Sequence, residues 1–420
     1  MCHLRSKEML SKHENDGAAN EVKMLLEKCK NLARKAKAER PHMWHTNPDF
    51  RDYVPERALA DKLIDHYFRT MESTHRILHI PHFKLEYEQY WVNPLSTPTT
   101  SVVKILLVMA IGACFHQEED HMTVRAMAQQ WVYSAQSWVG APFEKSRLNL
   151  SGLQVQCLLL LARQTNGVGG DVIWIGAGAL LRTAFQMGFH RDPNNFSKMS
   201  IMHKEMRRRL WATVLELCVQ TSLDSGMPPL ITTLDYDTAP PSNIDDCDFS
   251  EVTTVQPASK PESMFAQASI QIQLFKTLGT RIRISQLINN FRIDPSYEEI
   301  LSLGAEIGNS IKEATTLLSS YPAHLPHPTI LQRNLLNLVL RRFMLALHRP
   351  SALKFSQDSK YYFSRKVCLD TAVTILSLSG FESGVVIESG KMDDFTRLKV
   401  ACGGFYKEIF MAAGVILACE

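Results

Sequence analysis

The apolar stretches of this chain repeat their large side chains at helical spacing. Leucine, alanine and methionine dominate "SVVKILLVMAIGACFHQ", "MTVRAMAQQWVYSAQSWVG", "LSGLQVQCLLLLARQT" and "DVIWIGAGALLRTAFQMGFH". In the last of these, one face is formed by Ile173, Ala177, Leu180, Ala184 and Met187. Steps of three and four residues place side chains on one side of an α-helix. No segment shows the alternation that is typical of strands, so the sequence predicts an all-α fold.

The distribution of polar segments divides the chain into five parts. Residues 1–40 form a basic N-terminal extension with a short heptad helix, and 41–56 form a connector that contains proline and histidine. Residues 57–250 form a helical core, whose first helix, in "ALADKLIDHYFRTMESTHRILH", is expected to end against Pro81. A stretch rich in Ser, Thr and Pro, 251–263, reads as a polar linker or loop. Residues 264–420 resume the helical pattern as the C-terminal half of the same domain.

Composition excludes several classes of protein. The 420 residues are 45% hydrophobic, which is enough for a large core, and the net charge of +3 is too small to steer the whole chain to DNA or membranes. The apolar runs are shorter than the roughly 20 residues of a membrane helix. The nine cysteines include no CxxC pair, which predicts an intracellular protein with reduced thiols. We expect no metal ion and no cofactor.

The N-terminal extension contains one segment with a helical pattern. Val22, Leu25, Cys29, Leu32 and Ala36 follow the spacing of a coiled-coil seam over two heptads. Two readings stay open: an amphipathic helix docked on its own domain, or a dimerising or nuclear-import element. The import element would use the basic residues Lys28, Lys30, Arg34, Lys35, Lys37 and Arg40.

Two segments carry residues that are typical of metal sites. His75 and His79 are four residues apart, with His82 nearby, but Arg76 stands where a zinc protease has its glutamate. We therefore expect ordinary histidines at a helix end. The second segment, "NIDDCDF", holds Asp245, Asp246 and Asp248 and resembles the aspartate-rich motif of all-α isoprenoid synthases, which hold magnesium diphosphate. It follows two prolines and so predicts a solvated acidic turn, but a magnesium-dependent enzyme remains the alternative.

Three consecutive arginines in "EMRRRLW" raise the question of nucleic-acid binding. Successive residues of a helix diverge by about 100°, so Arg207, Arg208 and Arg209 cannot all enter one groove. We expect them to pair with carboxylates such as Glu205 and Asp192. Trp211 lies on the apolar side of the same helix and is predicted to be buried.

The order of five motifs resembles the fungal-specific transcription factor domain, the middle region of the zinc-cluster regulators. The motifs are "LLRTAFQMGFHRD", "EMRRRLW", "SLDSGMPPLI", "DYDTAPPSNIDDCDF" and the later "LHRPSAL". "SGMPP" departs from the usual Gly-Arg-Pro of the family. The residues that carry the resemblance, with an implied structural or regulatory role, are His190, Arg191, Asp192, Glu205, Arg208, Arg209, Trp211, Gly226, Pro228, Asp246, Arg349 and Pro350.

The resemblance implies a function in transcription. The first forty residues contain only Cys2 and Cys29, whereas the family's DNA-binding module uses six cysteines, so this chain by itself is not expected to form that module. Either the module is absent or it is encoded upstream of Met1. The resemblance implies a nuclear regulator without catalysis, controlling a fungal secondary-metabolite cluster of the trichothecene type. It would act through other regulators or coregulators, as a homodimer or heterodimer, and through a small ligand.

Overall fold

The computed structural model describes residues 24–25, 27–28, 31, 49–140, 147–196, 198–290, 295–355, 357–378, 392–401 and 413. The chain divides into two units, Met1–Asp49 and Phe50–Glu420. In the first unit, residues 24, 25, 27, 28 and 31 are helical and exposed. Leu25 and Lys28 are therefore described. The other predicted heptad and import positions lie outside the described residues: Val22, Cys29, Lys30, Leu32, Arg34, Lys35, Ala36, Lys37 and Arg40.

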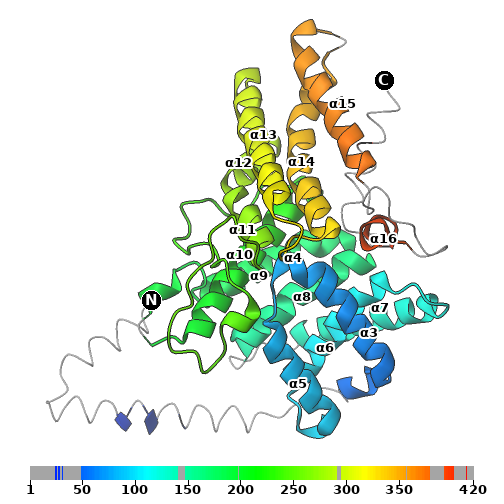
Figure 1. Cartoon of the computed structure of the whole chain (residues 1–420), viewed down its shortest axis with the longest axis vertical. Helices are drawn as coiled ribbons and strands as arrows, with labels where there is room; N and C mark the ends of the chain where they lie inside the picture. Colours follow the sequence, from blue (N-terminus) through cyan, green and yellow to red (C-terminus); the bar gives the residue numbers. More distant parts are fainter. Residues whose placement is uncertain are drawn as a thin grey trace, which may run out of the picture. The chain divides into compact units, whose positions relative to one another are not determined.

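The second unit is built from helices, which confirms the all-α prediction. No strand occurs among the described residues. The unit begins at the buried Phe50, inside the predicted connector. The α-helices, labelled in Figure 1, are α3 (Arg57–Tyr67), α4 (Ser73–His75), α5 (Ile80–Val92), α6 (Thr99–Gly112), α7 (His121–Gly140), α8 (Leu150–Asn166), α9 (Ile173–Gln186), α10 (Ile201–Ser225), α11 (Ser269–Lys276), α12 (Leu278–Ile288), α13 (Tyr297–Ser320), α14 (Ile330–Ala352), α15 (Tyr362–Ser377) and α16 (Asp394–Ala401).

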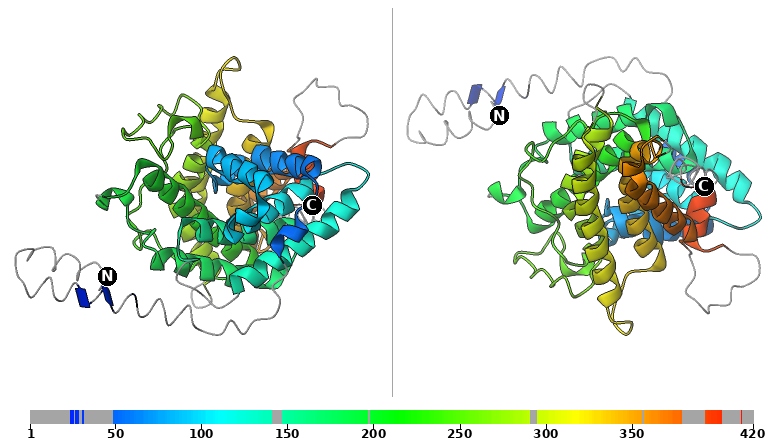
Figure 2. Two further views of the ribbon diagram at one scale, coloured as in Figure 1. Left: turned by 90° about the horizontal axis from the view of Figure 1, so that it is seen from below. Right: turned by 90° about the horizontal axis from the view of Figure 1, so that it is seen from above.

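Helices α6 and α10 lie at the centre of this unit. From Ser101 to Gly112, α6 is buried at every position, between α3, α7 and α8. Gly112 allows the approach of α3, since a Cβ at this position would lie 1.9 Å from the carbonyl oxygen of Leu63. Helix α10 contacts α8, α9, α11 and α12, and α14 lies against α13 and α15. Figure 2 shows these C-terminal helices from above, with α14 packed against both α13 and α15.

Helix α10 is capped at both ends. The Ser200 side chain accepts a hydrogen bond from the backbone N–H of His203, which satisfies one of the free donors of the first turn. At the other end Gly226 follows the last turn with φ of 63°, a conformation that glycine adopts without steric cost. The 25 residues between these caps carry one side of the candidate site.

The prediction of one helix running to Pro81 is wrong. The chain passes from α3 through a π-helical turn, Phe68–Glu72, into α4 and leaves the helical path at Arg76. Arg76 has φ of 51°, a left-handed conformation that costs a non-glycine residue about 1–2 kcal/mol. Pro81 lies in the first turn of α5, where its missing N–H is not needed. The break at Arg76 directs this side chain into the core.

Candidate functional site

A row of buried polar side chains runs along one side of helix α10. The row consists of Glu205, Arg209, Thr213, Glu216 and Gln220, at steps of three and four residues. All five are buried, with exposed fractions between 0% and 7%. Buried polar groups cost free energy unless they are hydrogen-bonded, so the partners of this row determine which other segments can pack against α10.

The first half of the row belongs to a buried group of charges, here called the Asp246 cluster. It comprises Glu72, Arg76, Glu205, Arg209 and Asp246, none of which is more than 3% exposed. Arg209 Nη1 donates to Asp246 Oδ1 at 2.5 Å, and Arg76 Nη2 donates to the same oxygen. Arg209 Nε also donates to Glu205 Oε1 at 3.4 Å. The cluster therefore joins α10 to the turn after α4 and to the loop before α11.

The backbone around Asp246 is held by further hydrogen bonds. Asp246 Oδ2 accepts from the N–H of Ile80 at 2.8 Å, and the N–H of Asp246 donates to Gln267 Oε1 at 2.8 Å. His79 Nε2 donates to the carbonyl oxygens of Asp246 and Phe249, at 2.9 and 3.1 Å. His79 Nδ1 accepts from a backbone N–H. These hydrogen bonds hold the start of α5 against the loop that contains Asp246.

The charges of the cluster do not balance if every group is ionised. Three carboxylates face two guanidinium groups, and burial raises the pKa of Glu72 to about 7. Burial opposes the ionisation of Asp246 as well, but the positive charges of Arg76 and Arg209 hold its pKa at about 2. Protonation of Glu72 near neutral pH removes one of these negative charges. The charge of Glu72 therefore changes near neutral pH.

We expect the substitution Glu72→Gln to remove a pH dependence of stability. Glu72 titrates near its ordinary value of 4.5 in the unfolded chain and at about 7 in the folded one. Between these values the folded state binds the additional proton, so the free energy of unfolding falls as the pH rises and levels off above about 7. The expected fall is about 2 to 3 kcal/mol.

Urea unfolding of both proteins between about pH 5 and pH 8 measures this effect. His66 and His348 act in the opposite direction, because burial lowers their pKa values to about 4 and the folded state resists their protonation. They contribute equally to both proteins, so the difference between the two pH profiles isolates Glu72. Parallel profiles would contradict the prediction.

The second half of the row forms a separate network with α12 and α14. Arg281 donates through Nη1 and Nη2 to the two carboxylate oxygens of Glu216, at 2.8 and 2.7 Å. Gln220 Nε2 donates to Glu216 Oε1 at 2.6 Å, and Arg342 donates to Gln220 Oε1 and to Asp224. Burial opposes ionisation of Glu216, but Arg281 and these hydrogen bonds lower its pKa. The network ties α10 to the C-terminal helices.

Hydrogen bonds and ion pairs join the turn after α9 to the loop at residues 237–239, and these contacts are here called the clasp. Asp192 accepts from Arg208 Nη2 at 3.1 Å and from the N–H of Ala239 at 2.9 Å. The N–H of Asp192 donates to Asp237, which also pairs with Arg191 at 3.2 Å. The clasp brings the motifs "GFHRD" and "DYDTA" together beside α10.

The three consecutive arginines are engaged within the fold. Arg208 pairs with Asp192 and Arg209 with Glu205, the two carboxylates expected from the sequence as partners. No described carboxylate pairs with Arg207, so the expectation is wrong for this residue. Arg207 donates to the carbonyl oxygen of Gly188 at 2.6 Å, and its guanidinium carbon lies 4.2 Å from the centre of the Phe189 ring. None of the three is exposed, so they do not form a basic surface.

Trp211 is fully buried, as the sequence predicts. Its ring makes edge contacts with Phe185 and Tyr236, with centroids 5.5 and 5.7 Å apart. The ring centroids of His190 and Phe185 are 4.8 Å apart, and burial lowers the pKa of His190. Aromatic side chains therefore fill the space between α9, α10 and the 236–239 loop.

The expectation of a solvated acidic turn is wrong for Asp246, which is 3% exposed. Asp245 accepts from Lys260 and from the N–H of Gln267, and Asp248 accepts from the N–H of Asp245. The three carboxylates are thus each engaged by protein donors instead of forming an array for a metal ion. The physical reason is the pairing of Asp246 with two buried arginines, which outweighs the solvation of a loop carboxylate.

The three histidines whose spacing is typical of a zinc site have different surroundings in the structure. His75 ends α4 and donates through Nδ1 to the carbonyl oxygen of Met71. His79 caps α5 with both nitrogens engaged, and the half-buried His82 lies 3.8 Å from Glu86 and 3.5 Å from Glu251. Elsewhere, His116, Glu118 and Asp120 place ligand atoms within 4.8 Å of one another. Asp120 pairs there with His116 at 2.6 Å and Glu118 with Lys62 at 2.8 Å.

Four of the residues that carry the family resemblance take no part in the contacts described above. Gly226 ends α10 and Pro228 follows it in an exposed loop. Arg349 and Pro350 are exposed in the last turn of α14. Sequence reasoning missed Glu72, Arg76, Glu216, Arg281 and Arg342. The polar row of α10 could have predicted that Glu216 has a buried partner, because polar residues at helical steps on a buried helix require hydrogen-bond partners.

No helix in the described part of the chain is long and apolar enough to cross a bilayer. A family model described as the fungal specific transcription factor domain matches residues 64–312. "Transcription factor opdR" of Penicillium oxalicum is 38% identical to this chain over 92% of its length and 50% of the relative. "Transcription factor lepE" of Aspergillus flavus is 35% identical, over 95% of this chain and 48% of the relative.

"Aspyridones cluster regulator apdR" of Emericella nidulans is 30% identical, over 88% of this chain and 48% of the relative. The chain spans about half the length of the curated relatives it matches. No solved structure matches it.

Proposed function

We propose, from the premise that this chain belongs to the fungal specific transcription factor domain family, that it is the regulatory region of a pathway-specific transcriptional regulator. The family match over residues 64–312 carries this proposal. The relatives support the pathway, because one of them is named as the regulator of a secondary-metabolite cluster. A trichothecene-type cluster remains a prediction from the sequence.

The buried charges of α10 support a role as a rigid scaffold. The Asp246 cluster and the Glu216 network connect α10 to segments on both sides of it in the sequence. Broken buried ion pairs are costly, so the segments around α10 hold one arrangement. The residues that carry the family resemblance would then have a structural role, as the frame on which partner and ligand surfaces are displayed.

The engaged arginines support action through partners instead of direct DNA contact. A protein that binds DNA by charge uses exposed lysines and arginines. Arg207, Arg208 and Arg209 instead make hydrogen bonds and ion pairs within the protein. We therefore propose a nuclear protein that works with other regulators or coregulators, as a homodimer or heterodimer, and responds to a small ligand. The alternative of a magnesium-dependent enzyme has no support from the aspartates at 245, 246 and 248.

Deletion of the gene in the fungus that carries it tests this proposal. We expect the transcripts of one contiguous biosynthetic cluster to change, with restoration by the wild-type gene and by the surface variant Asp248→Ala, because Asp248 lies outside the buried cluster. Transcript profiling measures the outcome. A transcriptome that is the same with and without the gene would contradict the proposed role.

A gel-shift experiment with the purified chain tests the DNA part separately. We expect no sequence-specific binding to the promoters of that cluster. Specific, salt-sensitive binding that survives removal of residues 1–40 but is lost in a folded Arg207→Ala, Arg208→Ala, Arg209→Ala variant would show that the arginines contact DNA after all.

A further inference from the structure

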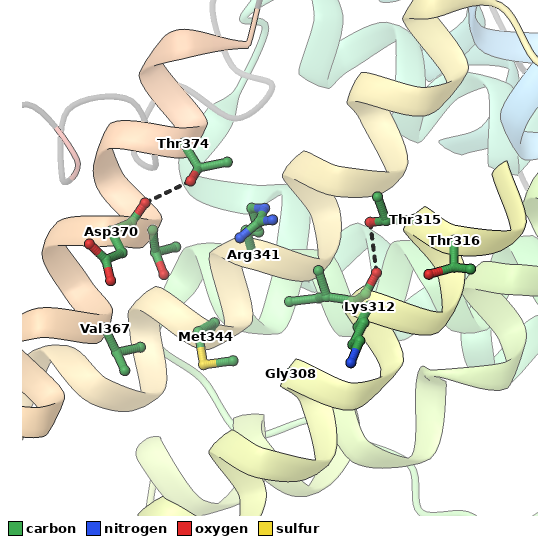
Figure 3. A pocket seen from close by; sticks show the side chains of 11 residues that line it. Gly308, Lys312, Thr315, Thr316, Arg341, Met344, Val367, Asp370 and Thr374 are labelled. Carbon is green, nitrogen blue, oxygen red and sulfur yellow. Dashed lines mark hydrogen bonds between the residues drawn. The ribbon is translucent and has the colours of Figure 1, made fainter. Parts of the chain in front are cut away.

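A groove lies between α13, α14 and α15, away from the buried charges of α10. Its volume is about 440 Å³, within the range of roughly 300–1,000 Å³ that is usual for small-molecule sites. Figure 3 shows side chains from the three helices around this space. The groove is lined by Gly308, Ile311, Lys312, Thr315, Thr316, Arg341, Met344, Val367, Asp370, Thr371 and Thr374.

Arg341, from the middle helix of the three, is the unusual residue of the groove. It is half-buried, its Nε is enclosed without a hydrogen-bond partner, and no described residue forms an ion pair with its guanidinium. Burial lowers the pKa of Arg341. By contrast, the buried Arg209, Arg281 and Arg342 each pair with a carboxylate. A desolvated cation without a counter-charge is unfavourable, so Arg341 is suited to an anion from outside.

The charges around Arg341 favour an anion in the groove. Lys312 lies on α13 at the same groove, and it is exposed and forms no ion pair with a described residue. Asp370 is the one carboxylate among the lining residues, and in Figure 3 its carboxylate turns away from Arg341. Two cations therefore face one anion, which leaves a net positive charge.

The remaining wall of the groove is partly apolar. Ile311, Met344 and Val367 come from α13, α14 and α15 respectively. An inorganic ion would leave the half-buried Met344 and Val367 in contact with water, whereas an organic anion would cover them and gain from their burial. The guanidinium fork of arginine matches the two oxygens of a carboxylate.

We propose that this groove binds a small organic carboxylate with an apolar body. Its carboxylate would lie on Arg341 with Lys312 beside it, and its apolar body would contact Ile311, Met344 and Val367. The proposed function includes a small ligand, and this proposal names its chemical class. Only the effect of ligand binding on transcription rests on the proposed function. A bound ligand would join α13, α14 and α15 and so stabilise one arrangement of these helices.

Binding of octanoate to the purified 420-residue chain tests the site. We expect octanoate to bind saturably and to raise the melting temperature, while octanol, which has a similar apolar body without the charge, does so much less. Arg341→Met keeps an apolar stem but removes the charge, so it should weaken octanoate binding by about 10- to 100-fold. Calorimetric titration measures the affinities.

Three controls make the experiment decisive. Arg349→Met alters an exposed arginine of the same helix and should leave octanoate binding unchanged. Lys312→Gln, at an exposed position, should weaken binding several-fold at low salt. Arg341→Met should leave the melting temperature of the free protein unchanged or raise it, because it removes an uncompensated charge. A marked loss of stability in the free protein would instead assign Arg341 a structural role and overturn the proposal.

Other results would also overturn the proposal. They are the absence of octanoate binding, equal binding by Arg341→Met, or an equal effect of inorganic phosphate, which would indicate an adventitious ion only. The gene deletion distinguishes the two proposals. If deletion changes cluster transcripts but octanoate does not bind, the groove proposal alone fails. If octanoate binds but deletion has no effect, the transcriptional role fails.

Discussion

Asp246→Ala should lower the free energy of unfolding by about 3–5 kcal/mol, the usual cost of removing one partner from a buried ion pair. The substitution leaves Arg76 and Arg209 in the core without the carboxylate that both contact. It also removes the acceptor for the N–H of Ile80 at the start of α5. The loss is large because Arg76 and Arg209 are at most 1% exposed. Water therefore cannot solvate their charges when the carboxylate is removed.

Urea unfolding of the purified chain measures this loss, and Asp248→Ala is the matched control. Asp248 lies two residues away in the same loop with a side chain that is 30% exposed, and its pairing with Lys260 is at the surface. We expect this control to cost less than about 1 kcal/mol. Equal losses for the two variants would show that the loop, and not the buried pairing, sets the stability.

The double variant Asp246→Ala, Arg209→Met separates charge from packing. If the cost of Asp246→Ala comes from an unpaired guanidinium, removing Arg209 as well should restore part of the stability. The two substitutions would then be coupled by about 0.5–3 kcal/mol, as is usual for groups in direct contact. Additive losses would contradict the assignment of the cluster as one electrostatic unit.

Trp211→Ala should destabilise the fold by about 3–5 kcal/mol, the usual cost of deleting a large aromatic side chain from a core. Trp211 is fully buried and contacts the rings of Phe185 and Tyr236. Its removal would leave a cavity between α9, α10 and the 236–239 loop. Because the packing around helix α10 is continuous with the core, the surrounding side chains cannot collapse fully into that space.

Two variants control this experiment. Trp211→Phe keeps an aromatic ring and should cost less than half as much, since Trp211 Nε1 has no hydrogen-bond partner to lose. Tyr133→Ala removes an aromatic side chain that is 63% exposed, and it should change the stability by no more than about 0.5 kcal/mol. Thermal and urea unfolding measure all three, and an unchanged melting temperature for Trp211→Ala would contradict the packing.

Helix formation and helix sides could be predicted from the sequence, because both depend on residues a few positions apart. The spacing of Ile173, Ala177, Leu180 and Ala184 predicts the side of α9 that is buried. The same local reasoning predicts a buried Trp211 and names Glu205 as a carboxylate partner for the arginines, which the structure assigns to Arg209, one turn away. The order of the motifs predicts the family, which the match over residues 64–312 confirms.

Pairings between distant segments were decided only by the tertiary structure. The contacts of Asp246 with Arg76, and of Glu216 with Arg281, join residues separated by 170 and 65 positions. Spacing along the chain does not specify which helices will meet, and an aspartate that follows two prolines has the sequence pattern of a solvated turn. Asp246 is buried because the left-handed turn at Arg76 and the polar row of α10 bring two guanidinium groups to the same point. The free energy of that pairing arises only when the three segments pack together and exclude water.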